Sequence, residues 1–297
     1  MDSSLKETGN YLMNELYGID PEVPSSLRDI NYLTELFGLH RGRFIASFPF
    51  DWQKLILNNL SNLPDLEHAK VVNKLKKLMD ATLPIDAEYR RTKKWVENIF
   101  ELQTQKRCLS NVYSTPANPY EYPSLVDVLQ GEEDLPDGIG DFIPMTVKSY
   151  RAVVRPLFLK SSEVHFIDKF FNLRNGANRD TFRWKVLQGL FEEAKISKRC
   201  NSFCFHLHIA TFPTEKAQNI FLEDAGEVAN EIGFKDLDIS YTLDSKQHGR
   251  YIFSVKGGLK FDQGFQTDRD PSKTNDIQWL SPKLLNKLLD EYDRGYV

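Results

Sequence analysis

The chain has 297 residues, enough for one large domain or two ordinary ones with a sizeable core. A hydrophobic content of 41% and a charged content of 27% are typical of a globular protein, and a net charge of −4 excludes a surface that is basic throughout. No apolar run is long enough to span a bilayer, the first residues lack the apolar core of a signal peptide, and three cysteines fit a reducing compartment, so we expect a cytoplasmic protein.

Helical patterns dominate residues 1–110. Ser25 or Ser26 can cap the first helix, and apolar residues recur at helical spacing in three stretches, which predicts helices over 25–36, 65–83 and 88–105. Residues 43–50 favour a strand, and a further helix is expected to begin near Asp51. These patterns predict a mostly helical domain over residues 1–110.

The composition changes in the next stretch. Pro116, Pro119 and Pro123 lie among polar and aromatic residues and cannot continue a helix, and residues 131–140 are acidic and rich in glycine and proline. We therefore expect a Pro/Gly-rich connector over residues 111–145.

The second half alternates between strand and helix patterns. A helix is expected over 146–160, and a helix that begins with Ser281 as its cap and Pro282 as its first residue is expected after the last strand. Between them, strands are predicted over 164–170, 201–212, 236–243 and 276–280, and helices over 180–195 and 214–232. This order predicts an α/β fold with a mixed sheet that is covered by helices on both faces.

One segment, HGRYIFSVKGGLKFDQGF over residues 248–265, predicts two strands that meet at a tight turn at Gly257-Gly258. Alternation along the first strand places His248, Arg250 and Ser254 on one face. An imidazole can act as a nucleophile or a proton carrier, and a guanidinium is a planar fork of donors. The segment therefore indicates a phosphate site.

Residues 146–297 resemble the phospholipase D-like fold through the strand VHFID, the segment HGRYIFSVKGGLKFDQGF and the closing DIQWLSP. The resemblance implies a mixed sheet sandwiched by helices. Catalytic members carry His-x-Lys followed, after four residues, by Asp; two copies face each other, and one histidine forms a covalent phosphoenzyme. The matching positions here hold His248, Arg250 and Val255, so the carboxylate is missing, and the chain carries one copy. Residues 1–110 show no such resemblance.

Several side chains could complete this site. The candidate catalytic residues are His248 and Arg250, and Asp168 or Asp262 could replace the missing carboxylate. The candidate phosphate-binding residues are Arg250, Ser254, Asp168, Lys169 and Arg174. The alternative is a solvated strand end at which Arg250 pairs with an acid such as Asp168, followed by an ordinary surface loop.

Two other groups of residues have structural alternatives. Cys204, His206 and His208 alternate onto one face of a strand, and their spacing favours burial beneath a helix over a zinc site, so no metal or cofactor is expected. Basic runs at 74–77 and 90–94 are solvated faces or, if aligned, a nucleic-acid stripe.

The resemblance leads to three functional hypotheses. The first is a recognition module of a bacterial multi-protein system, such as anti-phage defence, which binds a phosphate-containing ligand, nucleic acid or a partner protein without catalysis. The alternative is a metal-independent phosphodiesterase or nuclease that acts as a homodimer, with His248 attacking phosphorus. Membrane association, which some relatives show, would need a basic or apolar surface that a net charge of −4 does not indicate.

Overall fold

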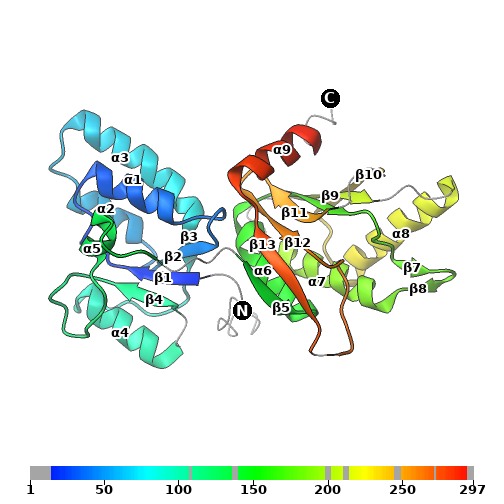
Figure 1. Cartoon of the computed structure of the whole chain (residues 1–297), viewed down its shortest axis with the longest axis horizontal. Coiled ribbons are helices and arrows are strands. Elements are labelled where there is room, and N and C mark those ends of the chain that lie inside the picture. Colours follow the sequence, from blue (N-terminus) through cyan, green and yellow to red (C-terminus); the bar gives the residue numbers. More distant parts are fainter. Residues whose placement is uncertain are drawn as a thin grey trace. The chain divides into compact units, whose positions relative to one another are not determined.

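The computed structural model describes residues 15–106, 109–135, 140–197, 202–209, 214–243, 249–270 and 272–292. The chain divides into two compact units, Met1–Gly138 and Ile139–Val297. Each unit combines a β-sheet with helices (Figure 1), so the expected mixed α/β class is confirmed.

The first unit is built on a parallel sheet with the strand order β3-β2-β1-β4. Its strands are β1 (Glu15–Ile19), β2 (Arg43–Ser47), β3 (Thr82–Pro84) and β4 (Asn111–Tyr113). Its helices are α1 (Leu27–Leu36), α2 (Trp52–Asn59), α3 (Asp65–Leu78), the short 3-10 helix η2 (Met79–Ala81), α4 (Trp95–Lys106) and α5 (Leu125–Gln130). Figure 1 shows α1 and α3 on one side of the sheet and α4 on the other.

The helices of this unit agree with the sequence analysis better than its strands do. Ser26 caps α1 by accepting from the backbone N–H of Asp29, as expected. The residues before Trp95 form a loop rather than the start of a helix, and the sheet itself is not predicted apart from β2. Two of its strands have only three residues, too few for an alternation to show, and strands buried on both faces lack one.

Residues 111–145 are not a connector, which corrects the expected domain boundaries. They contain β4, α5 and the strand β5 (Gly140–Pro144), and the first unit continues to Gly138. The amide of Asn118 orders the Pro-rich loop: its Oδ1 accepts from the backbone N–H groups of Tyr120 and Tyr122, and its Nδ2 donates to two carbonyls. The prolines therefore lie in loops between paired elements.

The second unit contains a seven-stranded mixed sheet with the order β10-β9-β6-β11-β12-β13-β5. β6, β9 and β10 are parallel, and the remaining neighbours are antiparallel. The strands besides β5 are β6 (Glu163–Asp168), β9 (Phe203–Ile209), β10 (Leu237–Leu243), β11 (Arg250–Ser254), β12 (Gly257–Phe261) and β13 (Thr274–Trp279). A small separate hairpin pairs β7 (Arg174–Asn175) with β8 (Asn178–Arg179).

Helices cover both faces of this sheet, as expected. α6 (Val147–Lys160), α7 (Thr181–Ser197) and α8 (Glu215–Glu231) begin close to the predicted starts, with Thr146, Asp180 and Thr214 as their caps. The rings of Phe158 on α6 and Phe191 on α7 pack on Phe205 of β9. α9 (Pro282–Tyr292) lies on the opposite face, where its Leu288 and Tyr292 pack with Ile167 and Phe253.

The hairpin turn lies two residues earlier than predicted. Ser254 pairs with Gly257, so Val255 and Lys256 form the turn, and both glycines belong to β12. A Cβ atom on Gly258 would lie 2.4 Å from Phe253 Cβ and 2.7 Å from Leu280 Cδ1. Gly258 is therefore required by close packing against its neighbours, and its role as a turn residue was a wrong prediction.

Candidate phosphate-binding site at the rim of the second sheet

The candidate site lies where β6 ends and β11 begins. Asp168 is the last residue of β6, Arg250 is the first residue of β11, and the two residues are directly paired in the antiparallel ladder. Directly paired residues project from the same face of a sheet. The topology thus brings two of the predicted site residues together.

The carboxylate of Asp168 is held by backbone donors. Its side chain is buried, with 2% of the residue exposed. Oδ1 accepts from the N–H of Phe170 at 3.0 Å, and Oδ2 accepts from the N–H of Phe265 at 3.2 Å. Hydrogen bonds from two N–H groups compensate a carboxylate for lost hydration. Asp168 therefore ties the turn after β6 to the loop between β12 and β13.

The guanidinium of Arg250 is fixed at one end. Its Nη1 donates to the carbonyl of Asp262 at 2.6 Å. Its Nε lies 3.8 Å from Asp168 Oδ1, beyond hydrogen-bonding distance, and is buried without a hydrogen-bond partner among the residues that the structure describes. A Cβ atom on Gly264 would lie 3.3 Å from Asp168 Oδ2 and 3.6 Å from Arg250 Nε. A glycine at this position therefore leaves room beside both groups.

Lys169 and Phe170 complete the rim. Phe170 is 55% exposed, with Lys169 Nζ 5.3 Å and Arg250 Cζ 5.8 Å from its ring centroid. Both distances are within the range of a cation–π contact. Lys169 was predicted as a site residue from its place after the strand; Phe170 was missed because an aromatic residue at a strand end reads as core.

Two of the predicted phosphate-binding residues lie elsewhere. Ser254 is at the other end of β11, about 13 Å from Arg250 at the rise of an extended strand, and it is buried against Ser161, with Oγ atoms 2.8 Å apart. Arg174 donates through Nε and Nη2 to the buried carboxylate of Asp224 at 2.6 and 2.7 Å. That pair anchors the β7–β8 hairpin to α8. Neither residue belongs to the rim site, because alternation and loop position do not fix where a side chain's partners lie.

His248 lies outside the described residues, so its predicted catalytic role has no structural description. Val255, at the position where the catalytic phospholipase D-like pattern has aspartate, lies in the hairpin turn and is 67% exposed. The nearest described carboxylate to Arg250 is instead supplied by Asp168 from the neighbouring strand.

The histidines of β9 lie on the face covered by α9. His165 Nδ1 and His208 Nε2 are 3.0 Å apart, and the ring of Tyr292 lies 4.5 Å from that of His208. His206 Nε2 lies 2.7 Å from Glu163 Oε1, and its Nδ1 bonds to Ser240. Among the described residues, no group of three or more His, Cys, Asp or Glu side chains is arranged to hold a metal ion.

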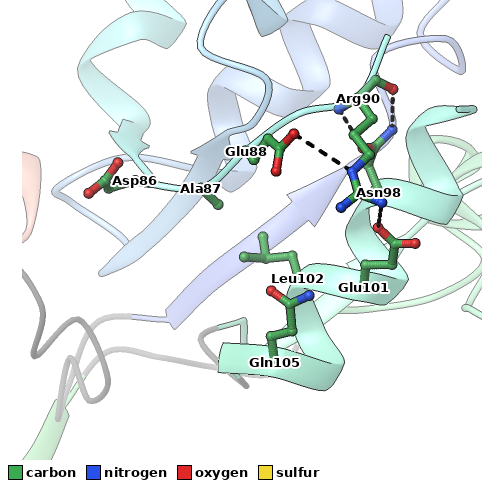
Figure 2. Close-up of a pocket in the computed structure, with 8 residues that line it drawn as sticks. All are labelled: Asp86, Ala87, Glu88, Arg90, Asn98, Glu101, Leu102 and Gln105. Carbon is green, nitrogen blue, oxygen red and sulfur yellow. Dashed lines mark hydrogen bonds and ion pairs between the residues drawn. The ribbon is translucent and has the colours of Figure 1, made fainter. Parts of the chain in front are cut away.

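A separate polar pocket of about 270 Å³ lies in the first unit, between α4 and the loop that precedes it. Figure 2 shows Arg90 in this pocket with ion pairs to Glu88 and Glu101. Asn98 fixes the loop, accepting from the N–H of Arg90 at 2.8 Å. Arg91 pairs with Asp51 and Lys93 with Glu101, so the basic run lies on the loop before α4, and three of its four cations are ion-paired.

A buried acid at the carboxyl edge of the first sheet was missed by the sequence analysis. Ser114 Oγ, after β4, donates to Oδ2 of Asp20, after β1, at 2.6 Å, and Asp20 is 5% exposed. Burial raises the pKa of Asp20, while the hydrogen bonds from Ser114 and the N–H of Glu22 act in the opposite direction. Predicting this pair requires knowing that β1 and β4 are neighbours, which no local pattern reveals.

Comparisons with known proteins add little. No protein-family model and no curated protein matches the chain. Among solved structures, the chain is similar to TrmBL2, described as an archaeal chromatin protein with a novel mode of DNA binding, at 10% identity over 83% of this chain and 80% of that one, with a TM-score of 0.30. A TM-score of this size does not indicate a shared fold. No described helix combines the length and apolarity needed to cross a bilayer.

Proposed function

We propose that the second unit is a phospholipase D-like recognition module that binds a phosphate-bearing ligand through Arg250. The observation that carries this proposal is the state of the guanidinium: Nη1 is fixed on the carbonyl of Asp262, whereas Nε and Nη2 make no hydrogen bond within the described chain. Because Nε is buried beside Asp168, Nη2 is the donor that remains for an oxygen of an external phosphate or carboxylate.

Two other arginines of the same unit form close ion pairs with buried carboxylates. Arg174 uses its Nε–Nη2 edge to hold Asp224, and Arg155 uses the same edge to hold Glu193 at 2.6 and 3.1 Å. At Arg250 the nearest carboxylate is at 3.8 Å and already accepts two backbone N–H groups. The guanidinium is thus preorganised and only loosely compensated, which favours an external anion at Nη2.

The charges at the rim also support an anionic ligand. Arg250 and Lys169 place two positive charges at the rim beside Asp168, whose carboxylate is partly neutralised by its backbone donors. A side chain that is 26% exposed keeps Arg250 within reach of a ligand. A phosphate that accepts from Nη2 would meet both cations.

The proposed module binds its ligand without catalysing a reaction. The aspartate position of the catalytic pattern is occupied by Val255 in an exposed turn, and a single copy of the motif stands in the chain. Asp168 is bound to the backbone and paired opposite Arg250, so its contacts are those of a residue that positions a neighbour. We further place this module in the cytoplasm, which the odd number of cysteines favours.

The test compares the binding of sodium pyrophosphate to the wild type, Arg250→Ala and Arg91→Ala by titration calorimetry. Arg91 is a matched control because it is an 82% exposed arginine of the first unit. Loss of a charge-assisted contact should weaken binding by Arg250→Ala about tenfold or more, whereas Arg91→Ala should bind like the wild type. Equal affinity of the wild type and Arg250→Ala would overturn the proposal.

A second measurement separates recognition from catalysis. Hydrolysis of bis-p-nitrophenyl phosphate with EDTA present should stay at background for the wild type and for His248→Asn. Hydrolysis that the wild type performs and His248→Asn loses would replace the recognition module by the metal-independent phosphodiesterase.

A further inference from the structure

We infer that the ligand of the rim site is single-stranded nucleic acid and that Phe170 is the platform on which a base stacks. This inference rests on the proposed function, because it places the base beside the phosphate that Arg250 binds. Phe170 is 55% exposed, although the next residue, Phe171, is 2% exposed and packs edge-on against Phe166 with centroids 4.9 Å apart. Of two adjacent phenylalanines, one anchors the core and the other presents its ring to solvent.

The exposed ring is held in a defined place. The N–H of Phe170 donates to Asp168 Oδ1 at 3.0 Å, and the N–H of Phe171 donates to the carbonyl of Asp168, also at 3.0 Å. These bonds form a tight turn directly after β6, whose last residue is paired with Arg250. Because the turn is fixed before a ligand arrives, little conformational freedom of this backbone is lost on binding.

The surroundings of the ring match a nucleotide better than they match other phosphate-bearing ligands. Arg250 Cζ and Lys169 Nζ lie 5.8 and 5.3 Å from the ring centroid, so cations adjoin the aromatic face. Single-strand-binding proteins combine these two features: aromatic rings stack on bases, and basic side chains meet the backbone phosphates. Inorganic phosphate and a lipid headgroup have no base to place on Phe170.

The same geometry selects unpaired strands. Bases in a duplex are stacked on their neighbours and do not present a face to a protein side chain unless they are extruded. Phe170 is a single ring in a short turn, with Asp168 and Phe171 buried behind it. It can therefore accept one unstacked base, and we expect the preference to be insensitive to which base it is.

The experiment measures binding of the full chain to fluorescein-labelled oligothymidylate by anisotropy, beside an abasic strand of the same length and the matching duplex. The variants are Phe170→Ala, Phe170→Trp, Arg250→Ala and Phe142→Ala. Phe142 is the matched control, since it is 67% exposed and lies on β5 at the far edge of the same sheet. Circular dichroism confirms that each variant is folded.

Removal of the ring should weaken binding of oligothymidylate about 5- to 150-fold, which is the stacking contribution of one base. Phe170→Trp should restore it, Phe142→Ala should leave it unchanged, and Arg250→Ala should weaken binding of both the thymidylate and the abasic strand. The wild type should prefer the thymidylate strand over the abasic strand and the duplex.

The outcomes distinguish the two proposals. If the abasic strand binds as well as oligothymidylate, or if Phe170→Ala binds both like the wild type, the inference about the base is overturned while anion binding by Arg250 stands. A duplex that binds more tightly than the single strand overturns it too. If no strand and no pyrophosphate binds the wild type, the proposed function fails, and this inference fails with it.

Discussion

Asp168 and Arg250 are paired across two antiparallel strands, yet the closest approach of Arg250 Nε to the carboxylate is 3.8 Å. The carboxylate instead accepts hydrogen bonds from the N–H groups of Phe170 and Phe265. A short ion pair would neutralise the arginine. The observed arrangement orients the guanidinium through its surroundings and leaves Nη2 as the donor for other oxygens.

This relationship predicts opposite effects of Asp168→Asn on stability and on ligand affinity. The amide can accept one of the two backbone N–H bonds with its oxygen but not both, so the free energy of unfolding should fall by about 1–3 kcal/mol. Removal of the negative charge should increase the affinity for pyrophosphate. Urea unfolding and calorimetry measure the two effects, and a variant that lost both stability and affinity would contradict the prediction.

Two glycines inside helices should respond in opposite ways to alanine. Gly226 in α8 has open space around its Cα, so Gly226→Ala should raise the free energy of unfolding by about 0.5–1 kcal/mol, the usual preference for alanine in a helix. A Cβ atom on Gly189 in α7 would lie 2.4 Å from Val147 Cγ1 of α6. Gly189→Ala should therefore destabilise by about 1–3 kcal/mol despite its better helix propensity. Thermal unfolding of both variants tests the pair, and stabilisation by both would show that α6 and α7 are less closely packed.

Neutralising the buried carboxylate of Glu193 should destabilise the protein far more than neutralising that of Glu192. Glu193 is fully buried and accepts from Arg151 and Arg155, whereas Glu192 is 35% exposed and accepts from Arg151 alone. Glu193→Gln would remove the buried negative charge that Arg151 and Arg155 share, at a cost of about 3 kcal/mol, the low end of the range for buried pairs because both arginines are one quarter exposed and Arg151 keeps Glu192. Glu192→Gln should cost less than about 1 kcal/mol. Chemical unfolding compares them; equal costs would refute the distinction.

The stability of the first unit should depend on pH through the ionisation of Asp20. Burial raises its pKa, so the folded protein retains a proton in the interval between the unfolded value of about 3.9 and the raised folded value. Within that interval the unfolded chain binds fewer protons, and the contribution of Asp20 to the free energy of unfolding falls as pH rises, becoming constant above the folded pKa. Asp20→Asn does not titrate.

Stability measured in urea at a series of pH values should therefore favour Asp20→Asn increasingly over the wild type as pH rises through this interval, and then level off. Ser114→Ala removes a hydrogen bond that lowers the pKa of Asp20, so in this background the levelling should move to higher pH. A flat difference would mean that the pKa of Asp20 is the same in the folded and unfolded protein, and a difference of opposite sign would mean that folding lowers it; either result contradicts the prediction.

Local sequence patterns predicted the helices that begin at a capping residue. Ser26, Thr146 and Thr214 each accept from the backbone N–H three residues later at a helix start, as their types indicate. The parallel sheet of the first unit was not predicted because its short buried strands show no alternation of apolar and polar residues. In addition, β1 pairs with β4, from which β2 and β3 separate it in the sequence. Propensity therefore located helices and left the pairing of strands undetermined.

The candidate site was likewise predicted only in part. The sequence analysis named Asp168 both as a substitute for the missing carboxylate and as an acid that could pair with Arg250, and the register places the two residues opposite each other. The structure places Ser254 and Arg174 away from this rim, because Ser254 is buried against Ser161 and Arg174 is paired with Asp224. Only the three-dimensional partners distinguish a structural arginine from one that is open to a ligand.

β5, the first strand of the second unit, pairs along its length with β13. A nascent chain emerging from the ribosome therefore exposes the segment Gly140–Pro144 long before Thr274–Trp279 has been synthesised. Until then this edge of the sheet stays open, and the non-local closure should make it among the last parts of the unit to form during biosynthesis.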